Sequence, residues 1–316
     1  MAENKQVIEM QEVAKATPAT DTKPPKKRRR RLGDRHDGRK LRTITPMTKI
    51  MPYIMPYRYD ACNTFADSIN VYRVDELCRR KVKQGMTNFG MLHVILAAYV
   101  RTVSQRPALN RFVSGQKIYA RNTIEVNMVV KRKMSLDTPD ACVKVRFDPT
   151  DTLDDVYEKF NKAVEENTTE GGSNDTDKLN RLLLCIPGLL LRWTVSFLKF
   201  LDYFGWLPKA ICSLSPFHGS MIITSMGSLG IKPIYHHLYD FGNLPVFIAY
   251  GAKRTVYEPD AEGKVHKRRY IDLKVVTDER ICDGFYYASA FKLFRRILEH
   301  PEQLELPPET VVEDVD

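Results

Sequence analysis

The chain has little of what marks several common classes of protein. Its 316 residues include six cysteines, which lie far apart and form no C-x-x-C pair. That spacing excludes a zinc ribbon and argues against a disulfide framework. The first residues, MAENKQVIEMQEV, are polar where a secretory signal peptide needs an unbroken apolar run. We therefore expect a protein that is made and kept in a reducing cytoplasm.

The sequence also lacks a hydrophobic run long enough to cross a membrane. The longest uncharged stretch of its most apolar segment, residues 182–207, is LLLCIPGLLL, whereas a spanning helix needs about 20 apolar residues. Polar side chains recur in this segment at helical spacing, at Arg192, Ser196, Lys199 and Asp202. Three interpretations are open: a core or oligomer contact, a cover or tunnel for an acyl substrate, and a helix lying in a membrane surface, which would make the protein peripheral to a membrane.

Composition and charge indicate a globular body between two charged ends. Hydrophobic residues make up 43% of the chain and aromatics 10%, which is ordinary for a globular protein. The net charge is +10, of which residues 23–42 carry +9, while residues 299–316 carry −7. We predict a disordered tail with a basic run at 1–42, a folded domain at 43–306 and an acidic tail at 307–316. The basic run, residues 26–31, is either a solvated arm or a site for anionic lipid, nucleic acid or an acidic protein.

Strand and helix patterns alternate along the folded part. Apolar alternation or short apolar runs predict strands at 68–74, 124–130, 141–147, 220–225, 245–250 and 270–277. Helical periodicity predicts a helix beginning near Val74 and longer helices at 89–105, 151–167 and 285–298. The mixture predicts an α+β fold, a two-layer sandwich in which helices pack on a mixed β-sheet.

The most informative segment is DERICDGFYYA at 278–288. A strand that ends in HxxxDG and is followed at once by a helix is the catalytic signature of the chloramphenicol acetyltransferase-like superfamily. This segment resembles the version D-H-R-V-x-D-G found in the catalytic domain of the dihydrolipoyl acyltransferases of 2-oxo acid dehydrogenase complexes. At one position the chain differs: Glu279 stands where that family has its catalytic histidine.

Other blocks resemble the same family in the same order, over residues 50–306. GSMIITSMGSLG at 219–230 is similar to the family's G-T-F-T-I-S-N-L-G strand, and LPVFIAYGA at 244–252 is similar to its P-P-Q-V-A-I-L-G-V-G. The first 43 residues resemble neither a lipoyl domain nor a subunit-binding module. The resemblance therefore implies a stand-alone acyltransferase-type domain without a swinging arm.

The resemblance also implies roles for particular residues. In the family the histidine takes the proton of a thiol, and a hydroxyl on the G-T-F-T-I-S strand stabilises the oxyanion; by position that hydroxyl belongs to Thr224 or Ser225. Asp283 is expected to hold the turn through a salt bridge. A thiol with a pKa near 8.5 needs a base close to neutrality, and a glutamate carboxyl serves only if burial raises its pKa from about 4.3.

Two further histidines lie where the family has P-I-I-N-P-P. His236 or His237 could supply the missing imidazole, although a structural role at an interface is the simpler interpretation. Two adjacent histidines alone are a weak metal signal, because neighbouring side chains of an extended segment point to opposite faces. We predict no metal site and no covalently bound cofactor.

Two functions from different classes follow. The first is an acyltransferase that uses an acyl-coenzyme A or acyl-thioester donor on an unknown acceptor, with coenzyme A thioester as its co-substrate and a homotrimer, or a multiple of it, as its assembly by resemblance. The second is a non-catalytic relative that keeps the fold as an oligomeric binding or scaffold protein, with Glu279 marking the loss of chemistry.

Overall fold

The structure, a computed structural model, describes residues 29–131, 140–168 and 185–316. Parts of two predictions lie outside the described residues: the first 28 residues of the predicted tail and the beginning of the apolar segment 182–207. The β-strands are β1 (Gly38–Lys40), β2 (Cys62–Asn70), β3 (Arg111–Ser114), β4 (Lys117–Arg121), β5 (Ile124–Lys131), β6 (Asp140–Phe147), β7 (Met221–Ser225), β8 (Val246–Tyr250), β9 (Arg254–Pro259) and β10 (Val265–Asp278). The α-helices are α2 (Pro46–Ile54), α3 (Tyr72–Lys83), α4 (Met91–Gln105), α5 (Leu153–Thr168), α7 (Gly188–Phe204), α8 (Lys209–Leu214) and α9 (Gly284–Glu299), with short 3-10 helices at Tyr59–Ala61, Pro107–Asn110, Gly227–Leu229 and Pro301–Glu305.

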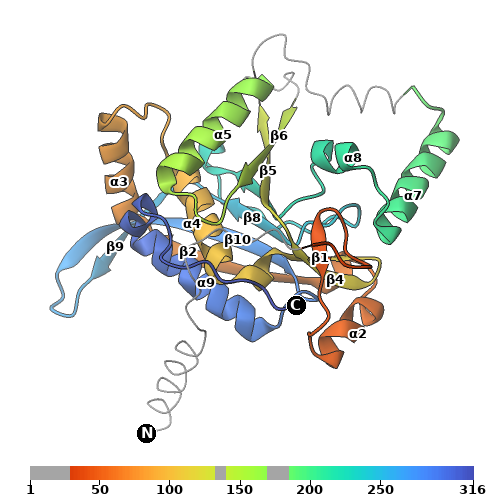
Figure 1. Cartoon of the computed structure of the whole chain (residues 1–316). Coiled ribbons are helices and arrows are strands. Elements are labelled where there is room, and N and C mark those ends of the chain that lie inside the picture. Colours follow the sequence, from red (N-terminus) through yellow and green to blue (C-terminus); the bar gives the residue numbers. More distant parts are fainter. Residues whose placement is uncertain (1–28, 132–139, 169–184) are drawn as a thin grey trace, which may run out of the picture.

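The main sheet has seven strands and mixed directions (Figure 1). Its order is β2-β10-β8-β7-β5-β6, and β9 pairs with the first half of β10. β7 runs parallel to both β5 and β8, while the other pairs are antiparallel. The prediction of an α+β fold with helices on a mixed sheet is confirmed.

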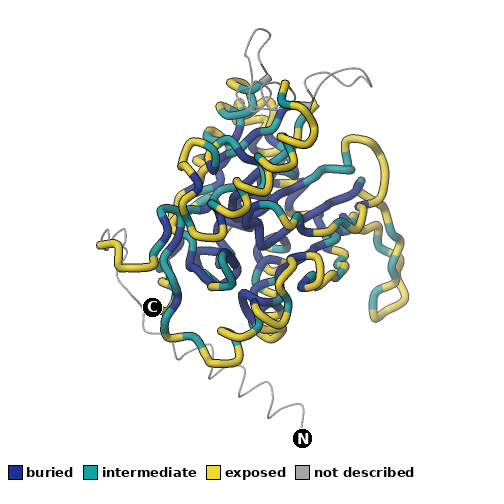
Figure 2. Tube along the Cα trace, turned by 90° about the vertical axis from the view of Figure 1, so that its right-hand side faces the viewer, coloured by how far each residue is buried: buried dark blue, intermediate teal, exposed yellow. Residues whose placement is uncertain are grey.

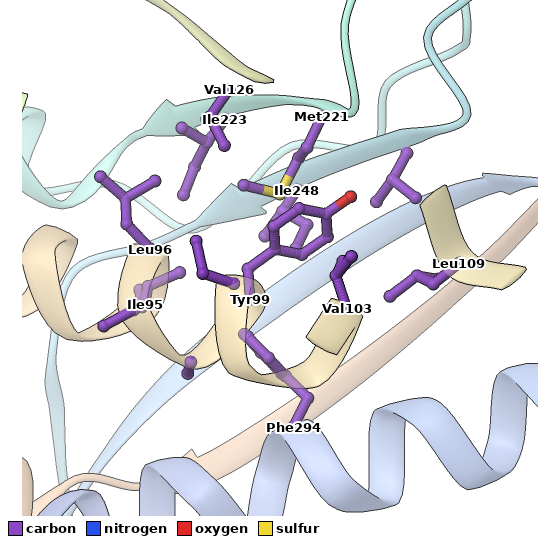
Figure 3. Packing of buried hydrophobic residues seen from close by; sticks show 14 of the residues in the cluster. Ile95, Leu96, Tyr99, Val103, Leu109, Val126, Met221, Ile223, Ile248 and Phe294 are labelled. Atoms are coloured by element: carbon purple, nitrogen blue, oxygen red, sulfur yellow. The ribbon is translucent and has the colours of Figure 1, made fainter. Parts of the chain in front are cut away.

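One face of this sheet forms the main hydrophobic core with the helices. α4 lies at its centre, and thirteen of its fifteen residues are buried. Figure 3 shows Tyr99 of α4 among Met221, Ile248 and Val103, with Phe294 of α9 on the other side of the helix. The Tyr99 hydroxyl donates to the carbonyl oxygen of Ser220 at 3.1 Å, so this buried polar group is satisfied.

The opposite face of the sheet carries a smaller apolar cluster. Ile222, Phe247 and Val276 belong to three adjacent strands and pack together with Leu238 and Leu244 from the loop before β8. Because side chains alternate along a strand, the neighbours of these strand residues point into the main core. Figure 2 shows the buried positions at the centre of the molecule and the exposed ones on outer helices and loops.

A second, three-stranded sheet of order β1-β4-β3 lies beside the main one. α2 packs against β4 and α7 against β3. The β3–β4 turn has Gly115 and Gln116 at φ of 54° and 56°, the left-handed region that a tight hairpin turn requires. Gly38 of β1 lies so close to Phe112 that a Cβ atom would come within 2.6 Å of the ring.

The predicted tail boundary at residue 42 is wrong, because the chain joins the fold earlier. β1 pairs with β4 through Gly38, Arg39 and Lys40, and both Arg35 and Leu41 are buried. Residues 29–42 are mostly charged and show no apolar pattern, so the sequence did not predict that they join the fold. Some partners of these residues are acidic groups far away in sequence: Arg35 pairs with Asp202, and Arg39 pairs with Asp316.

The acidic segment after residue 306 also belongs to the fold. Arg31 donates to the Asp316 carboxylate at 2.7 Å and Arg39 donates to it at 3.0 Å, while Arg111 forms a two-bond ion pair with Asp314. We call these four ion-pair bonds the arm–tail contact. The described end of the basic run therefore has a partner within the chain itself.

Two element predictions also need correction. The strand predicted at 68–74 is β2, which ends at Asn70, and α3 begins at Tyr72. Residues 188–204 of the apolar segment 182–207 form α7, and burial in the core of one copy, part of the first of its three interpretations, is wrong: Leu189, Trp193 and Trp206 are more than 60% exposed. In the described part of the chain no helix is both long and apolar enough to cross a membrane.

We predict that Asp314→Ala destabilises the protein by about 3 kcal/mol in denaturant unfolding, since it leaves the buried Arg111 guanidinium without its carboxylate. The side chains of Arg111 and Asp314 are only 11% and 8% exposed. Glu309→Ala, at an exposed position of the same segment, is the matched control and should change stability by less than about 0.5 kcal/mol. Equal effects of the two substitutions would contradict a structural role for the Arg111–Asp314 ion pair.

Candidate functional site

The turn between β10 and α9 is built on a buried ion pair. Asp278 and Arg280 are 1% and 2% exposed. Arg280 donates from Nε to Asp278 Oδ1 at 2.8 Å and from Nη2 to Oδ2 at 2.7 Å, a two-pronged geometry that fixes both side chains. It also donates to the carbonyl oxygen of Met55 at 2.9 Å. The turn is thereby fixed to the segment that follows α2.

A second buried guanidinium shares the same carboxylate. Arg58 Nε lies 3.5 Å from Asp278 Oδ2, and its Nη1 donates at 2.8 Å to the carbonyl oxygens of Tyr239 and Gly242. Burial lowers the pKa of Arg58; Asp278 opposes this shift and the neighbouring Arg280 adds to it. The loop 236–242 is consequently held against the end of β10.

Glu279 lies between these buried residues but is itself only half-buried. Its backbone N–H donates to the Ala61 carbonyl oxygen at 2.9 Å. Within the described ranges its carboxylate forms no hydrogen bond or ion pair. It is therefore the side chain of this turn that is available to a ligand.

Asp283 stabilises the turn in a different way from the one predicted. Its side chain accepts a hydrogen bond from the backbone N–H of Tyr286 at 2.8 Å, which makes it the N-cap of α9. Asp283 forms no salt bridge in the part of the chain that the structure describes. The expected salt bridge of this turn is instead the one between Asp278 and Arg280.

The two candidate oxyanion hydroxyls lie away from Glu279. Thr224 and Ser225 end β7, and both are half-buried. Met221 of β7 and Thr277 of β10 both pair with Val246 on the strand between them. Measured along the strands, Thr224 therefore lies three residues, about 10 Å, from the position of Thr277. Because β10 runs antiparallel to β7, Glu279 follows Thr277 in the direction that leads away from Thr224. One copy of the chain does not bring these hydroxyls and the carboxylate together.

The two candidate histidines lie on the sheet face opposite α4. The His236 ring stacks on Phe247 at 4.0 Å between ring centroids, and its Nδ1 lies 2.7 Å from the His237 carbonyl oxygen. His237 is exposed, with Nδ1 3.1 Å from the Leu238 carbonyl oxygen. Neither imidazole has a hydrogen bond or ion pair to Glu279. Among the described residues no group of three or more His, Cys, Asp or Glu could hold a metal ion.

A cavity of about 640 Å³, which was not predicted from the sequence, opens between β2 and α9, beside the turn. Its apolar lining includes Phe65, Tyr287 and Phe291, and Thr277 and Gly284 lie at its edge. Three cations of α9 also line it, namely Lys292, Arg295 and Arg296. These residues are spaced three residues and one residue apart, which places all three near one side of a helix. The sequence therefore contained a pattern from which this basic group could have been predicted.

Comparison with known proteins bears on the fold. No protein-family model matches the sequence, and no curated protein matches it either. Among solved structures, the cubic core of the pyruvate dehydrogenase multienzyme complex matches 84% of this chain and 94% of its own, at 14% identity and a TM-score of 0.51. The chain has the fold of a dihydrolipoyl acyltransferase core.

Two further structures with this acyltransferase-core fold are similar to the chain. A probable dihydrolipoamide acetyltransferase from Listeria monocytogenes matches 83% of this chain and 95% of its own, with 12% identity and a TM-score of 0.49. A chloramphenicol acetyltransferase matches 81% of this chain and 96% of its own, with 10% identity and a TM-score of 0.46.

We expect Asp283→Ala to destabilise the protein by about 1 kcal/mol, because it removes the N-cap of α9. Asp283→Asn keeps a side-chain oxygen that can accept from Tyr286 N–H but removes the charge, so it should stay close to wild type. Urea unfolding of both variants measures the difference. If Asn is as damaging as Ala, the charge of Asp283 matters and the capping interpretation fails.

Proposed function

We propose that the chain is an acyltransferase-type domain that uses an acyl-coenzyme A or acyl-thioester donor and has Glu279 in place of the usual catalytic histidine. The observation that carries this proposal is the half-buried Glu279 carboxylate, without a partner in the described ranges, at the end of a strand that Asp278 and Arg280 hold rigid. The acyltransferase-core fold supports it.

The donor binds in the cavity between β2 and α9. Phe65 and Phe291, whose ring centroids are 4.6 Å apart, provide an apolar wall for the pantetheine arm and the acyl chain. Arg295 is paired with Asp67, whereas Lys292 and Arg296 form no ion pair with any described residue. These two cations are free to bind the phosphates of coenzyme A.

Glu279 acts as the base in this mechanism, which requires that the bound donor shield its half-buried carboxyl from water. It takes the proton of a thiol, and the resulting thiolate attacks the acyl carbon of the donor thioester. This addition forms the new carbon–sulfur bond and a tetrahedral oxyanion; when the oxyanion collapses, the old carbon–sulfur bond breaks, and the departing thiolate of the donor takes the proton from Glu279. Since Thr224 is remote from Glu279 in one copy, we propose that Thr224 of a second copy supplies the oxyanion hydroxyl in a homo-oligomer, by resemblance a trimer or a multiple of it.

A non-catalytic acyl-thioester-binding or scaffold protein is the second candidate. The separation of Glu279 from Thr224 favours it, as does the lack of any hydrogen bond between Glu279 and the imidazoles of His236 and His237. Such a protein keeps the cavity and the buried ion pairs but transfers nothing.

Acyl transfer separates the two candidates. Transfer from acetyl-coenzyme A to dihydrolipoamide should be slow in wild type, fall by about 100-fold or more in Glu279→Gln and rise in Glu279→His, because imidazole is the better base toward a thiol. Equal, measurable rates in wild type and Glu279→Gln would show that Glu279 is not the base. No transfer by any of the three proteins would favour the binding or scaffold function.

Binding of the donor is tested separately by calorimetric titration with coenzyme A. Wild type should give saturable heat, and Lys292→Glu with Arg296→Glu should weaken binding by about tenfold, the equivalent of about 1.4 kcal/mol. Arg79→Glu with Lys83→Glu, two charge reversals at exposed positions of α3, is the matched control and should bind as wild type does. Equal weakening by the control would mean that only overall charge matters.

A further inference from the structure

The outer side of α7 carries an apolar stripe that the protein leaves exposed. Leu190, Trp193, Phe197, Phe200 and Phe204 follow one another at alternating spacings of three and four residues, and each is between 50% and 74% exposed. That spacing places all five along one side of the helix. We call these five residues the aromatic stripe. Exposed apolar surface of this kind marks an interaction site more often than chance.

The stripe is presented by a helix that is firmly attached. At the end of α7, Asp202 is buried and accepts a hydrogen bond from Arg35 Nη2 at 2.7 Å. Arg35 also donates to Ser114 Oγ at 2.7 Å, which links the helix to β3. Burial opposes ionisation of Asp202, but His218 and Arg35 outweigh it and lower the pKa of Asp202. These contacts fix which side of α7 faces the rest of the protein.

The rings of the stripe contact one another instead of the body. Phe200 and Phe204 have centroids 4.9 Å apart, and Phe204 stacks on Trp206 at 5.0 Å. The opposite, body-facing side of α7 contributes Leu191, Leu198 and Leu201, which are half-buried. The apolar arc of α7 is thus wider than the part that the protein covers.

The charges beside the stripe indicate what covers it. Arg192 and Lys199 are exposed on α7, and the helix has one acidic residue, Asp202, which Arg35 neutralises. A second copy of α7 would bring like charges together without an exposed anion to compensate them. An anionic lipid surface supplies the phosphates that these cations need, and Arg and Lys side chains reach such headgroups while their stems lie on apolar surface.

The dimensions of α7 fit a helix that lies in the membrane surface. Its 17 residues correspond to about 25 Å, too short to span a bilayer. Tryptophan, phenylalanine and leucine on one side and basic residues on the flank are typical of interfacial helices. α2 packs on the same three-stranded sheet and also exposes apolar side chains, among them Met47 and Ile54; both helices lie on the right-hand side of Figure 1.

We propose that the aromatic stripe of α7 inserts into the headgroup region of an anionic lipid bilayer and attaches the protein to a membrane surface. The proposal rests on exposure, spacing and charge in α7. It is independent of whether the chain transfers acyl groups.

The full-length protein tests this directly with lipid vesicles. Wild type should co-sediment with phosphatidylcholine vesicles that contain phosphatidylglycerol and bind pure phosphatidylcholine much less. The chain has two tryptophans, Trp193 and Trp206, both exposed beside or in the stripe, so vesicle binding should shift their emission to shorter wavelength. An unchanged emission with bound protein would place the contact elsewhere and overturn the proposal.

Substitution separates α7 from other parts of the surface. Trp193→Ser with Phe197→Ser should weaken vesicle binding by about tenfold or more, since two buried aromatic contacts with lipid are lost. Phe285→Ser, at a 66% exposed position of α9, is the matched control and should bind as wild type does. Unweakened binding of the double variant would show that another part of the chain, such as the basic run, binds the lipid, and would overturn the proposal.

Self-association is the remaining alternative. If wild type fails to bind anionic vesicles but forms oligomers in equilibrium sedimentation that Trp193→Ser with Phe197→Ser abolishes, a second copy covers the stripe and the proposal is wrong. Circular dichroism of the variant should match wild type, because both side chains are exposed and their replacement leaves the core intact.

Discussion

The Asp278 carboxylate, held between two buried guanidinium groups, is the interaction on which the candidate site depends. Arg280 binds it through two hydrogen bonds, and Arg58 approaches its other side. Through these two arginines the end of β10 is joined both to the segment after α2 and to the loop before β8. A buried charge is costly without such partners. Three buried ionic side chains, Asp278, Arg280 and Arg58, therefore fix the shape of this turn. That shape in turn determines the position of Glu279.

Buried ion pairs also fix the C-terminal end of α7. Arg35 serves both Asp37 and Asp202, and burial would raise the pKa of Asp37, but Arg35 lowers it to about 2. Both carboxylates thus stay ionised inside the protein, and the ion pair between Arg35 and Asp202 binds α7 to the segment before β1. Ionic contacts in the interior hold two surface features in place: a turn with an available carboxylate and a helix with exposed aromatic rings. The hydrophobic core itself explains neither position.

The sequence was informative where local pattern dominates. The helices at 89–105 and 285–298 and the strands at 124–130 and 220–225 show apolar periodicity, and the structure has α4, α9, β5 and β7 at these places. The strand predicted at 270–277 and the helix predicted at 285–298 also placed Glu279 directly after the end of a strand. The hairpin of β3 and β4 was missed, although Gly115 in S-G-Q-K is a usable turn signal.

The rest of the structure depends on pairs of residues far apart in sequence. Arg35 and Asp202, or Arg111 and Asp314, leave no periodic trace, because an ion pair is a property of two distant positions. For the same reason the role expected for Asp283 belongs to Asp278, and nothing local reveals that Thr224 lies at the far end of β7. A resemblance over short motifs indicates which residues matter but does not say which of them meet in one copy.

The arm–tail contact has a consequence for how the protein comes apart. It joins the segment around Arg31 and Arg39, near one end of the described chain, to Asp316 near the other end, and it joins Arg111 of β3 to Asp314. Backbone N–H groups of Arg42 and Thr43 add hydrogen bonds to Asp316. The described chain between residues 31 and 316 is in effect a loop that is closed without a covalent bond. Detachment of one of these two segments removes the partners of the other, so the two are lost or kept as a single cooperative unit.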